Sequence, residues 1–216
     1  MAVSREAPCP LHSECGGCKV MRWPEEVQLA DKADRVSRVL AHQVNRAHPS
    51  PRALGYRARI SMKSNAQGLL GYYQPRSHHW VHIPVCAIAR PEINAVLERL
   101  PALPGIPVVE LRSDGSRVVL AASTRLPGGK GSGKKGTRNA RSQLAGLDLE
   151  TLGLSGISLD GKKVQGDPHL QVEVCGIRHR LSVGSFFQVN LEVNQLLVQA
   201  VVDTVMASQP AGVLDL

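Results

Sequence analysis

The sequence has 216 residues, enough for one large domain or two small ones. Hydrophobic residues make up 43% of it, which predicts a buried core and excludes wholesale disorder. Aromatic residues make up only 3%, which argues against a sheet that stacks several RNA bases on several rings. No apolar run is long enough for a membrane span and the N-terminus does not read as a signal peptide, so we expect a cytoplasmic protein with no membrane partner.

The net charge of +8 is concentrated in one segment. Between Asp114 and Asp148 there is no acidic residue, whereas seven basic residues fall there: Arg117, Arg125, Lys130, Lys134, Lys135, Arg138 and Arg141. The rest of the chain is nearly neutral. A local positive charge suits a polyanionic partner, most often a nucleic acid. A solvated loop that keeps the protein soluble would carry the same charges, so both interpretations stay open.

Residues 1–50 are predicted to form a cysteine-bearing loop followed by a helix. Pro24 suits a first helical position, acidic residues follow it, and basic residues stand near the other end, an order that complements the helix dipole. Apolar residues recur at steps of three or four, at Val27, Ala30, Ala33, Val36 and Leu40. Two prolines in the stretch 45–51 end the segment.

Residues 51–180 are predicted to form a central α+β domain. In the first predicted strand, 57–63, Ala58, Ile60 and Met62 alternate with Arg57, Arg59, Ser61 and Lys63, which gives one buried face and one basic face. A helix is predicted from Pro91 to Leu100, and further strands at 69–73, 80–83, 108–111, 118–122, 157–159, 170–174 and 177–183. The Gly- and Lys-rich stretch 125–143 is predicted to be an exposed loop. Its glycines resemble a phosphate-binding loop, but Lys135 stands where Ser or Thr is needed and no convincing helix is expected to follow.

Residues 181–216 are predicted to begin a third unit. Residues 191–206 have the pattern of a helix, with Asn190 as its N-cap. The stretch 211–216 reads as the start of a buried strand. Overall we expect a mixed α/β and α+β fold: a cysteine loop and helix, a central α+β domain, and the first elements of a Rossmann-like domain.

Three of the five cysteines cluster as Cys9-x5-Cys15-x2-Cys18, which in a cytosolic protein points to a metal site rather than to disulfides. The two glycines between Cys15 and Cys18 let both sulfurs face one ion or cluster. We take Cys86, in a loop before a helix, as the fourth ligand, because Cys175 reads as a small buried hydrophobe inside a strand. Four thiolates suit zinc or an iron–sulfur cluster, and spacing does not separate the two.

The run from Ser185 to Asn190 places both phenylalanines of the chain, Phe186 and Phe187, beside two amides just before a helix. An aromatic face with adjacent amides can hold a planar base by stacking and by hydrogen bonds to its edge. Alternatively, one phenylalanine packs in the core and Asn190 only caps the helix.

Several of these motifs occur in the order found in RNA (uracil-5-)-methyltransferases: Cys9-x5-Cys15-Gly-Gly-Cys18, Gly55-Tyr56-Arg57-Ala58-Arg59, Cys86 before a helix, Phe186-Phe187-Gln188-Val189-Asn190, and Val213-Leu214-Asp215-Leu216. The sequence most resembles the iron–sulfur branch that modifies bacterial 23S ribosomal RNA. The resemblance implies that Cys9, Cys15, Cys18 and Cys86 ligate a 4Fe-4S cluster. It also implies that Phe186 stacks on the target uracil and that Gln188 belongs to the S-adenosylmethionine site. Asn190 and the basic residues Arg57, Arg59 and Lys63 are then expected on the RNA side, with the stretch 130–141 also meeting phosphates.

The family reaction begins with attack of a cysteine thiolate on uracil C6, which makes C5 nucleophilic. C5 then takes the methyl group and loses its proton to a base, on a nucleotide that has left its stack. By the resemblance, the nucleophile, the base and most of the S-adenosylmethionine site lie beyond Leu216, so we expect no catalytic residue here, no methylation by this chain alone, and completion by a C-terminal catalytic half. Ribosomal RNA is expected rather than transfer RNA. The alternative is a non-enzymatic, zinc-ribbon-like nucleic-acid-binding protein.

Overall fold

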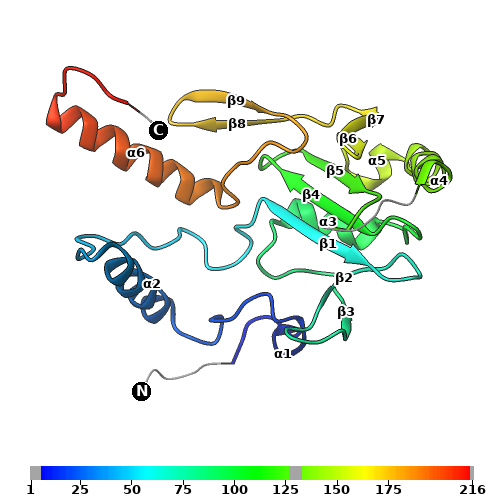
Figure 1. The fold of residues 1–216 in the computed structure, drawn as a ribbon, viewed down its shortest axis with the longest axis horizontal. Helices are drawn as coiled ribbons and strands as arrows, with labels where there is room; N and C mark the ends of the chain where they lie inside the picture. Colours follow the sequence, from blue (N-terminus) through cyan, green and yellow to red (C-terminus); the bar gives the residue numbers. More distant parts are fainter. Residues whose placement is uncertain (1–5, 127–132, 215–216) are drawn as a thin grey trace.

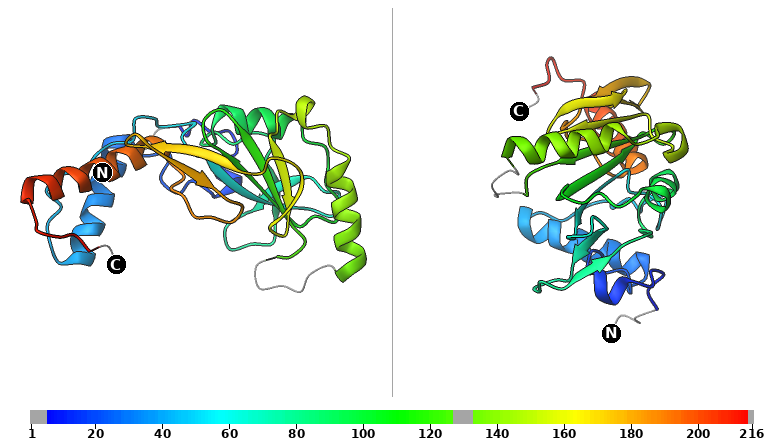
Figure 2. Two further views of the ribbon diagram at one scale, coloured as in Figure 1. Left: turned by 90° about the horizontal axis from the view of Figure 1, so that it is seen from above. Right: turned by 90° about the vertical axis from the view of Figure 1, so that its right-hand side faces the viewer.

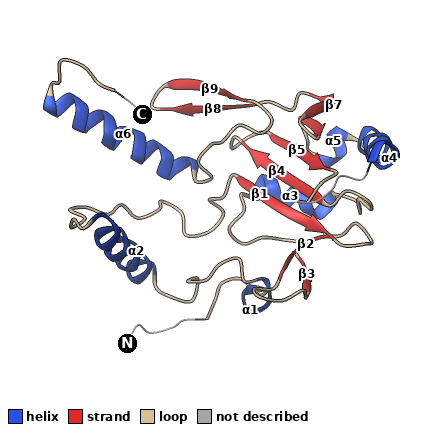
Figure 3. Cartoon of the chain, in the orientation of Figure 1, coloured by secondary structure: helices blue, strands red, loops and turns tan. Residues whose placement is uncertain are grey.

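The centre of the molecule is a seven-stranded sheet, seen in the computed structural model, which describes residues 6–126 and 133–214 (Figure 1, Figure 3). The strands lie in the order β3 (Trp80–His82), β2 (Leu70–Tyr73), β1 (Arg59–Ser64), β4 (Val108–Ser113), β5 (Val118–Ser123), β6 (Gly156–Leu159) and β7 (Lys162–Gly166). All neighbours are antiparallel except β5 and β6, which pair in parallel. The mixed fold predicted from the sequence is confirmed by this arrangement.

One face of the sheet is covered by three helices, α3 (Pro91–Arg99), α4 (Gly133–Ala145) and α5 (Leu149–Leu152). In β5, Val118, Leu120 and Ala122 point into this main core, while Val119 points to the opposite face. In β1, Ile60 and Met62 are buried on the same main face, so the predicted alternation of that strand is confirmed. The basic residues of β1 therefore lie on the other side of the sheet.

A hairpin and a long helix partly cover that other side. The hairpin is β8 (Leu170–Val174) with β9 (Ile177–Leu181), and the helix is α6 (Leu191–Ser208). Their shared core consists of Val119, Leu170, Val172, Val174 and Leu181, with Phe187, Leu191 and Val198 packed against it. The predicted domain boundary between residues 180 and 181 thus lies inside one core, to which residues before and after the boundary contribute.

The position of Cys175 corrects a prediction. Cys175 is exposed and forms the turn between β8 and β9 together with Gly176, at φ angles of 47° and 80°. A two-residue hairpin turn requires positive φ at both central residues, so the strand ends at Val174. The strand was predicted with these bounds, but the prediction of a buried Cys175 was wrong because it treated this turn residue as part of the strand's alternation.

The N-terminal part contains α1 (His12–Cys15) and α2 (Glu25–Leu40). The helix predicted after Pro24 is confirmed, but none of its residues is buried, and its last turns expose Val36, Val39 and Leu40. Both α2 and α6 extend away from the sheet toward the same side of the molecule (Figure 1, Figure 2). In the described part of the chain, no helix has both the length and the apolar character that a bilayer crossing requires.

Helix α4 replaces much of the loop predicted over 125–143. Ala140 is 4% exposed and Leu144 is fully buried, so one side of this lysine-rich helix packs on the sheet. Sequence reasoning missed it because only two apolar residues, four apart, mark the buried side, whereas the glycines pointed to a loop. The glycine motif is described only from Gly133 onward, and Lys130 lies outside the described residues.

The strand predicted over 211–216 is also corrected. Residues 211–214 form no strand, and Val213 and Leu214 are 66% and 80% exposed. A strand needs a neighbour to take its backbone hydrogen bonds, and no described strand runs beside these residues. Asp215 and Leu216, the rest of that prediction, lie outside the described residues.

Candidate functional site

The four cysteines predicted as ligands come from two loops. Cys9, Cys15 and Cys18 lie on the N-terminal loop around α1, and Cys86 lies on the loop before α3. All four are free and half-buried, and Cys15 and Cys86 pack against the main core. Gly16 lets the first loop turn back, because its φ is 63° and a Cβ there would overlap the ring of Pro75.

The four thiols lie within electrostatic reach of one another. Burial and, to a smaller extent, the neighbouring thiols of Cys86, Cys15 and Cys9 together raise the pKa of Cys18 to about 11. Burial likewise raises the pKa of Cys15, with Cys86 and Cys9 adding to the effect. Among residues 6–126 and 133–214, however, no three Cys, His, Asp or Glu side chains converge closely enough to hold one metal ion. The expected iron–sulfur cluster therefore stays a prediction.

The loop that carries Cys86 is fixed by Asn94 of α3. The Cys86 backbone N–H donates to Asn94 Oδ1 at 2.9 Å, and Asn94 Nδ2 donates back to the Cys86 carbonyl at 3.1 Å. On the other loop, His12 Nε2 lies 2.8 Å from the carbonyl of Cys18. Sequence analysis missed both residues, although an asparagine between the buried Ile93 and Val96 was a signal that a backbone needed a partner.

Arg57 takes a different direction from the one predicted. It precedes β1 and lines a cavity together with Cys18, whereas Arg59 and Lys63 lie on the open face of the sheet. Its positive charge lies close enough to Cys18 to lower the pKa of that thiol, although burial raises this pKa by more. Burial also raises the pKa of Tyr72, with the Cys86 thiol adding and Arg57 opposing.

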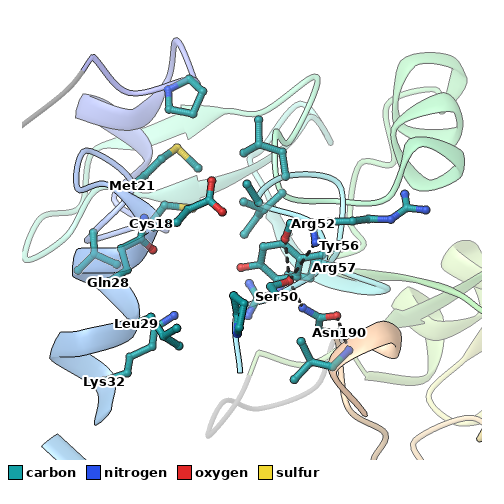
Figure 4. Close-up of a pocket in the computed structure, with 18 of the residues that line it drawn as sticks. Cys18, Met21, Gln28, Leu29, Lys32, Ser50, Arg52, Tyr56, Arg57 and Asn190 are labelled. Atoms are coloured by element: carbon teal, nitrogen blue, oxygen red, sulfur yellow. Dashed lines mark hydrogen bonds between the residues drawn. The ribbon is translucent and has the colours of Figure 1, made fainter. Parts of the chain in front are cut away.

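The cavity encloses about 710 Å³ between α2, residues 48–57 and the start of α6 (Figure 4). Its charged side chains are mostly basic, with Lys19, Lys32, Arg52 and Arg57 against Glu6 and Glu25. Asn190 stands at its edge, where Nδ2 donates to Ser50 Oγ at 2.9 Å and Oδ1 accepts from the Val193 N–H at 3.1 Å. The second bond confirms Asn190 as the N-cap of α6.

The run from Ser185 to Asn190 separates its two phenylalanines. Phe186 is 76% exposed, whereas Phe187 packs against the hairpin core. Buried Arg112 holds the preceding loop by donating to the carbonyls of Ser182, at 3.2 Å, and Ser185. Each interpretation of the run therefore applies to one ring: Phe187 has a structural role, and Phe186 presents a free aromatic face.

The open sheet face lies beside this run. Gln188 is exposed and borders the same small crevice as Arg59. Arg59 pairs with Glu110 at 2.8 Å, and Lys63 stands over the ring of Tyr73 at 5.2 Å from its centroid. Gln188 and Arg59 thus border this crevice and Lys63 lies on the same face of β1, apart from the cavity that Arg57 and Asn190 line.

An ion network absent from the sequence analysis joins the starts of α3 and α6. Arg90 pairs with Glu92 at 2.7 Å and with Glu192 at 2.9 Å, and Arg52 pairs with Glu192 at 3.2 Å. Burial opposes ionisation of Glu192, but hydrogen bonds from its own backbone N–H and from Arg90 lower its pKa overall. The network fixes the end of the run at Asn190 relative to the Cys86 loop.

Comparison with known proteins identifies relatives along nearly the whole chain, although no family model matches it. An uncharacterized RNA methyltransferase of Thermosynechococcus vestitus is 25% identical over 96% of this chain and 53% of its own length. The 23S rRNA (uracil(1939)-C(5))-methyltransferase RlmD of Salmonella typhi is 28% identical over 98% of this chain and 50% of its own length. The chain spans about half the length of the curated relatives it matches.

A solved structure has the same fold. The Pyrococcus abyssi tRNA (uracil-54, C5)-methyltransferase, crystallised with S-adenosyl-L-homocysteine, aligns with a TM-score of 0.65 over 90% of this chain and 52% of its own. At 19% identity this likeness concerns the fold. The sequence relatives confirm the resemblance predicted from the motifs: along nearly its whole length the chain is similar to proteins named as RNA methyltransferases, several of them 23S rRNA uracil-C5 methyltransferases.

Proposed function

We propose that this chain is the RNA-facing, cysteine-bearing part of an enzyme that methylates uridine C5 in RNA with S-adenosylmethionine as methyl donor. The observation that carries the proposal is the match over 98% of the chain to a 23S rRNA uracil-C5 methyltransferase. Several relatives bear that name, which favours 23S rRNA over tRNA as the substrate. The tRNA enzyme supports the fold only.

The exposed face of Phe186 supports a role in binding the target base. A free ring on a loop that buried Arg112 holds in place can stack on a base that has left its helix. Arg59, which shares a crevice with Phe187 and Gln188, and Lys63 on the same face of β1 can meet backbone phosphates. Gln188, at the crevice beside Arg59, is the residue we assign to the S-adenosylmethionine site.

We assign a 4Fe-4S cluster to Cys9, Cys15, Cys18 and Cys86. Around a tetrahedral zinc ion, neighbouring sulfurs lie about 3.8 Å apart. The four thiols lie near enough to one another to affect each other's pKa, which supports a shared site for the four cysteines. A bound cluster supplies a cross-link between the N-terminal loop and the main core. Half-buried thiols and the orphaned Nε of Arg57 beside them fit such an anionic group.

Catalysis requires a further catalytic half, in our proposal one that packs on α6. Among its described residues that helix buries only Asn194, and it exposes apolar side chains on several sides: Leu196, Leu197, Val201, Val202 and Met206. Such a surface is unusual for a helix without a partner. We place the protein in the cytoplasm, where five free cysteines would stay reduced.

The test is binding of the chain to an unmodified 23S rRNA hairpin and to a tRNA, measured over a range of salt concentrations. If about six basic residues meet phosphate, the log–log slope of affinity against salt is about −4 to −5. Phe186→Ala should weaken binding of the rRNA while leaving the slope unchanged, since stacking carries no charge. A slope near zero, or equal binding by Phe186→Ala, contradicts the RNA-facing role.

Methyl transfer is tested with the same RNA and radiolabelled S-adenosylmethionine. We expect none from the 216-residue chain alone, because the proposal places the nucleophile elsewhere. Label transferred to uridine C5 by this chain would overturn that part of the proposal.

A further inference from the structure

The backbone around Arg57 is fixed to the loop that carries Cys86. The Gly55 N–H donates to the Ala87 carbonyl at 3.0 Å, and the Arg57 N–H donates to the Ile88 carbonyl at 2.7 Å. The Arg57 carbonyl in turn accepts from the Arg90 N–H at 3.1 Å. Arg57 and Ala89 form a parallel bridge, so Gly55–Arg57 runs alongside the residues that follow Cys86.

The side chain of Arg57 lines the same cavity as the Cys18 thiol, on a wall whose other charged groups are mostly basic. It shares the cavity wall with Cys18 and Tyr56, and its charge is felt by Cys18, Tyr56 and Tyr72. Its Nε is buried and has no hydrogen-bond partner among the described residues. The neighbouring Arg52, by contrast, pairs with Glu192. A half-buried guanidinium with an unsatisfied N–H is unfavourable unless an anion completes the site.

Four thiolates around a 4Fe-4S core of charge 2+ form an assembly with a net charge of about −2. We infer that Arg57 is the counter-cation of the metal group held by the four cysteines, and that it serves this group rather than an RNA phosphate. The inference rests on the proposed cluster. The sequence analysis grouped Arg57 with Arg59 and Lys63 as residues on the RNA side. The inference gives Arg57 a different role from these two.

The inference predicts a direction for two measurable quantities. Without the positive charge, a dianionic assembly is held less firmly, so a chelator should remove its iron faster. One-electron reduction makes the assembly more negative, so loss of Arg57 should disfavour the reduced form. We expect about a tenfold change in the ratio of oxidised to reduced cluster, which is a potential about 59 mV more negative.

The experiment uses the full chain, purified without oxygen and reconstituted with iron and sulfide. It compares wild type, Arg57→Gln, Arg57→Lys and Arg59→Gln. Arg59 is the matched control, because it lies two residues away, on the open face, paired with Glu110. The readouts are the rate of iron loss to excess chelator, the midpoint potential, and the salt slope of RNA binding.

We expect Arg57→Gln to lose iron about tenfold faster than wild type. Arg57→Lys, which keeps the charge, should lose iron at close to the wild-type rate. Both variants should keep the wild-type salt slope of RNA binding. Arg59→Gln should lose iron at the wild-type rate and reduce the slope by about one phosphate contact. Equal iron loss from Arg57→Gln and Arg59→Gln overturns the inference, as does a reduced salt slope in Arg57→Gln with unchanged iron loss.

The outcome for wild type separates the two proposals. Wild-type protein that retains no metal overturns the cluster and Arg57's role with it, whereas wild type that retains iron while the variants behave alike overturns Arg57's role only. If wild type retains zinc instead, four thiolates again leave a net charge of about −2. The rates at which a chelator removes zinc from wild type and from the variants then decide the role of Arg57.

Discussion

Single side chains decide where the two cysteine loops meet, and Asn94 is the clearest case. It satisfies both the N–H and the carbonyl of Cys86 from inside α3. Asn94→Ala leaves the Cys86 N–H without a partner, whereas the Cys86 carbonyl keeps its bond from the Ala89 N–H, so we expect a loss of about 1–3 kcal/mol in the free energy of unfolding and weaker metal retention. Urea unfolding and metal analysis measure the two effects.

The control for Asn94 is Asn65→Ala, which removes one hydrogen bond to Leu69 in an exposed turn. Water can replace that bond, so the loss should stay below about 1 kcal/mol. Metal retention that is equal in the two variants would show that Asn94 does not position Cys86.

Asp114 couples the β4–β5 turn to the hairpin, and its stabilising effect depends on pH. Burial raises its pKa, but hydrogen bonds from the backbone N–H groups of Arg117, Ser116 and Gln171 outweigh burial and lower it overall. A carboxyl with a lowered folded pKa stabilises the fold above its unfolded pKa of about 4, and this stability is lost as pH falls through the folded value.

We therefore expect Asp114→Asn to reduce the free energy of unfolding by about 1–2 kcal/mol near pH 7. The difference from wild type should shrink as the pH falls below about 4. Chemical denaturation at a series of pH values measures this, with Glu98→Gln on the exposed side of α3 as the control. A difference that is constant down to pH 2 would contradict the hydrogen-bonded carboxylate.

At the scale of elements, α4 shows that the basic segment is part of the folded core. Leu144 is fully buried against the sheet, whereas Lys135 on the same helix is exposed. Leu144→Ala should cost about 3–5 kcal/mol, because it removes buried methyl groups and leaves a cavity. Lys135→Ala should change stability by less than about 0.5 kcal/mol. Equal unfolding midpoints for the two variants would mean that this segment is the loop predicted from its glycines.

The elements that sequence predicted well are those with local signals. The alternation of Ile60 and Met62, the proline that begins α3 and the cap at Asn190 each depend on neighbours within a few residues. The site was predicted less completely, because the direction of Arg57 and the role of Asn94 depend on contacts between distant segments. The periodicity of apolar residues indicates which face of one element is buried, but not which distant segment lies against it.

At the scale of the whole molecule, α6 exposes several apolar side chains to solvent. Val201 is 57% exposed and Met206 is 71% exposed. We expect the isolated chain to self-associate and to bind a hydrophobic dye through this helix. Val201→Lys should reduce both effects, whereas Thr204→Lys, at an exposed polar position of the same helix, should reduce them less. Analytical ultracentrifugation and dye fluorescence provide the measurements, and wild-type association and dye binding by Val201→Lys would contradict a role for α6.

We propose that four cysteines from two loops hold an iron–sulfur cluster. The most direct test is the visible spectrum of anaerobically purified protein, with iron, sulfide and zinc quantified on the same sample. The account predicts a broad brown absorption near about 400 nm with about four irons and four sulfides per chain. A colourless protein with about one zinc per chain would contradict it and would favour a zinc-bound nucleic-acid-binding module.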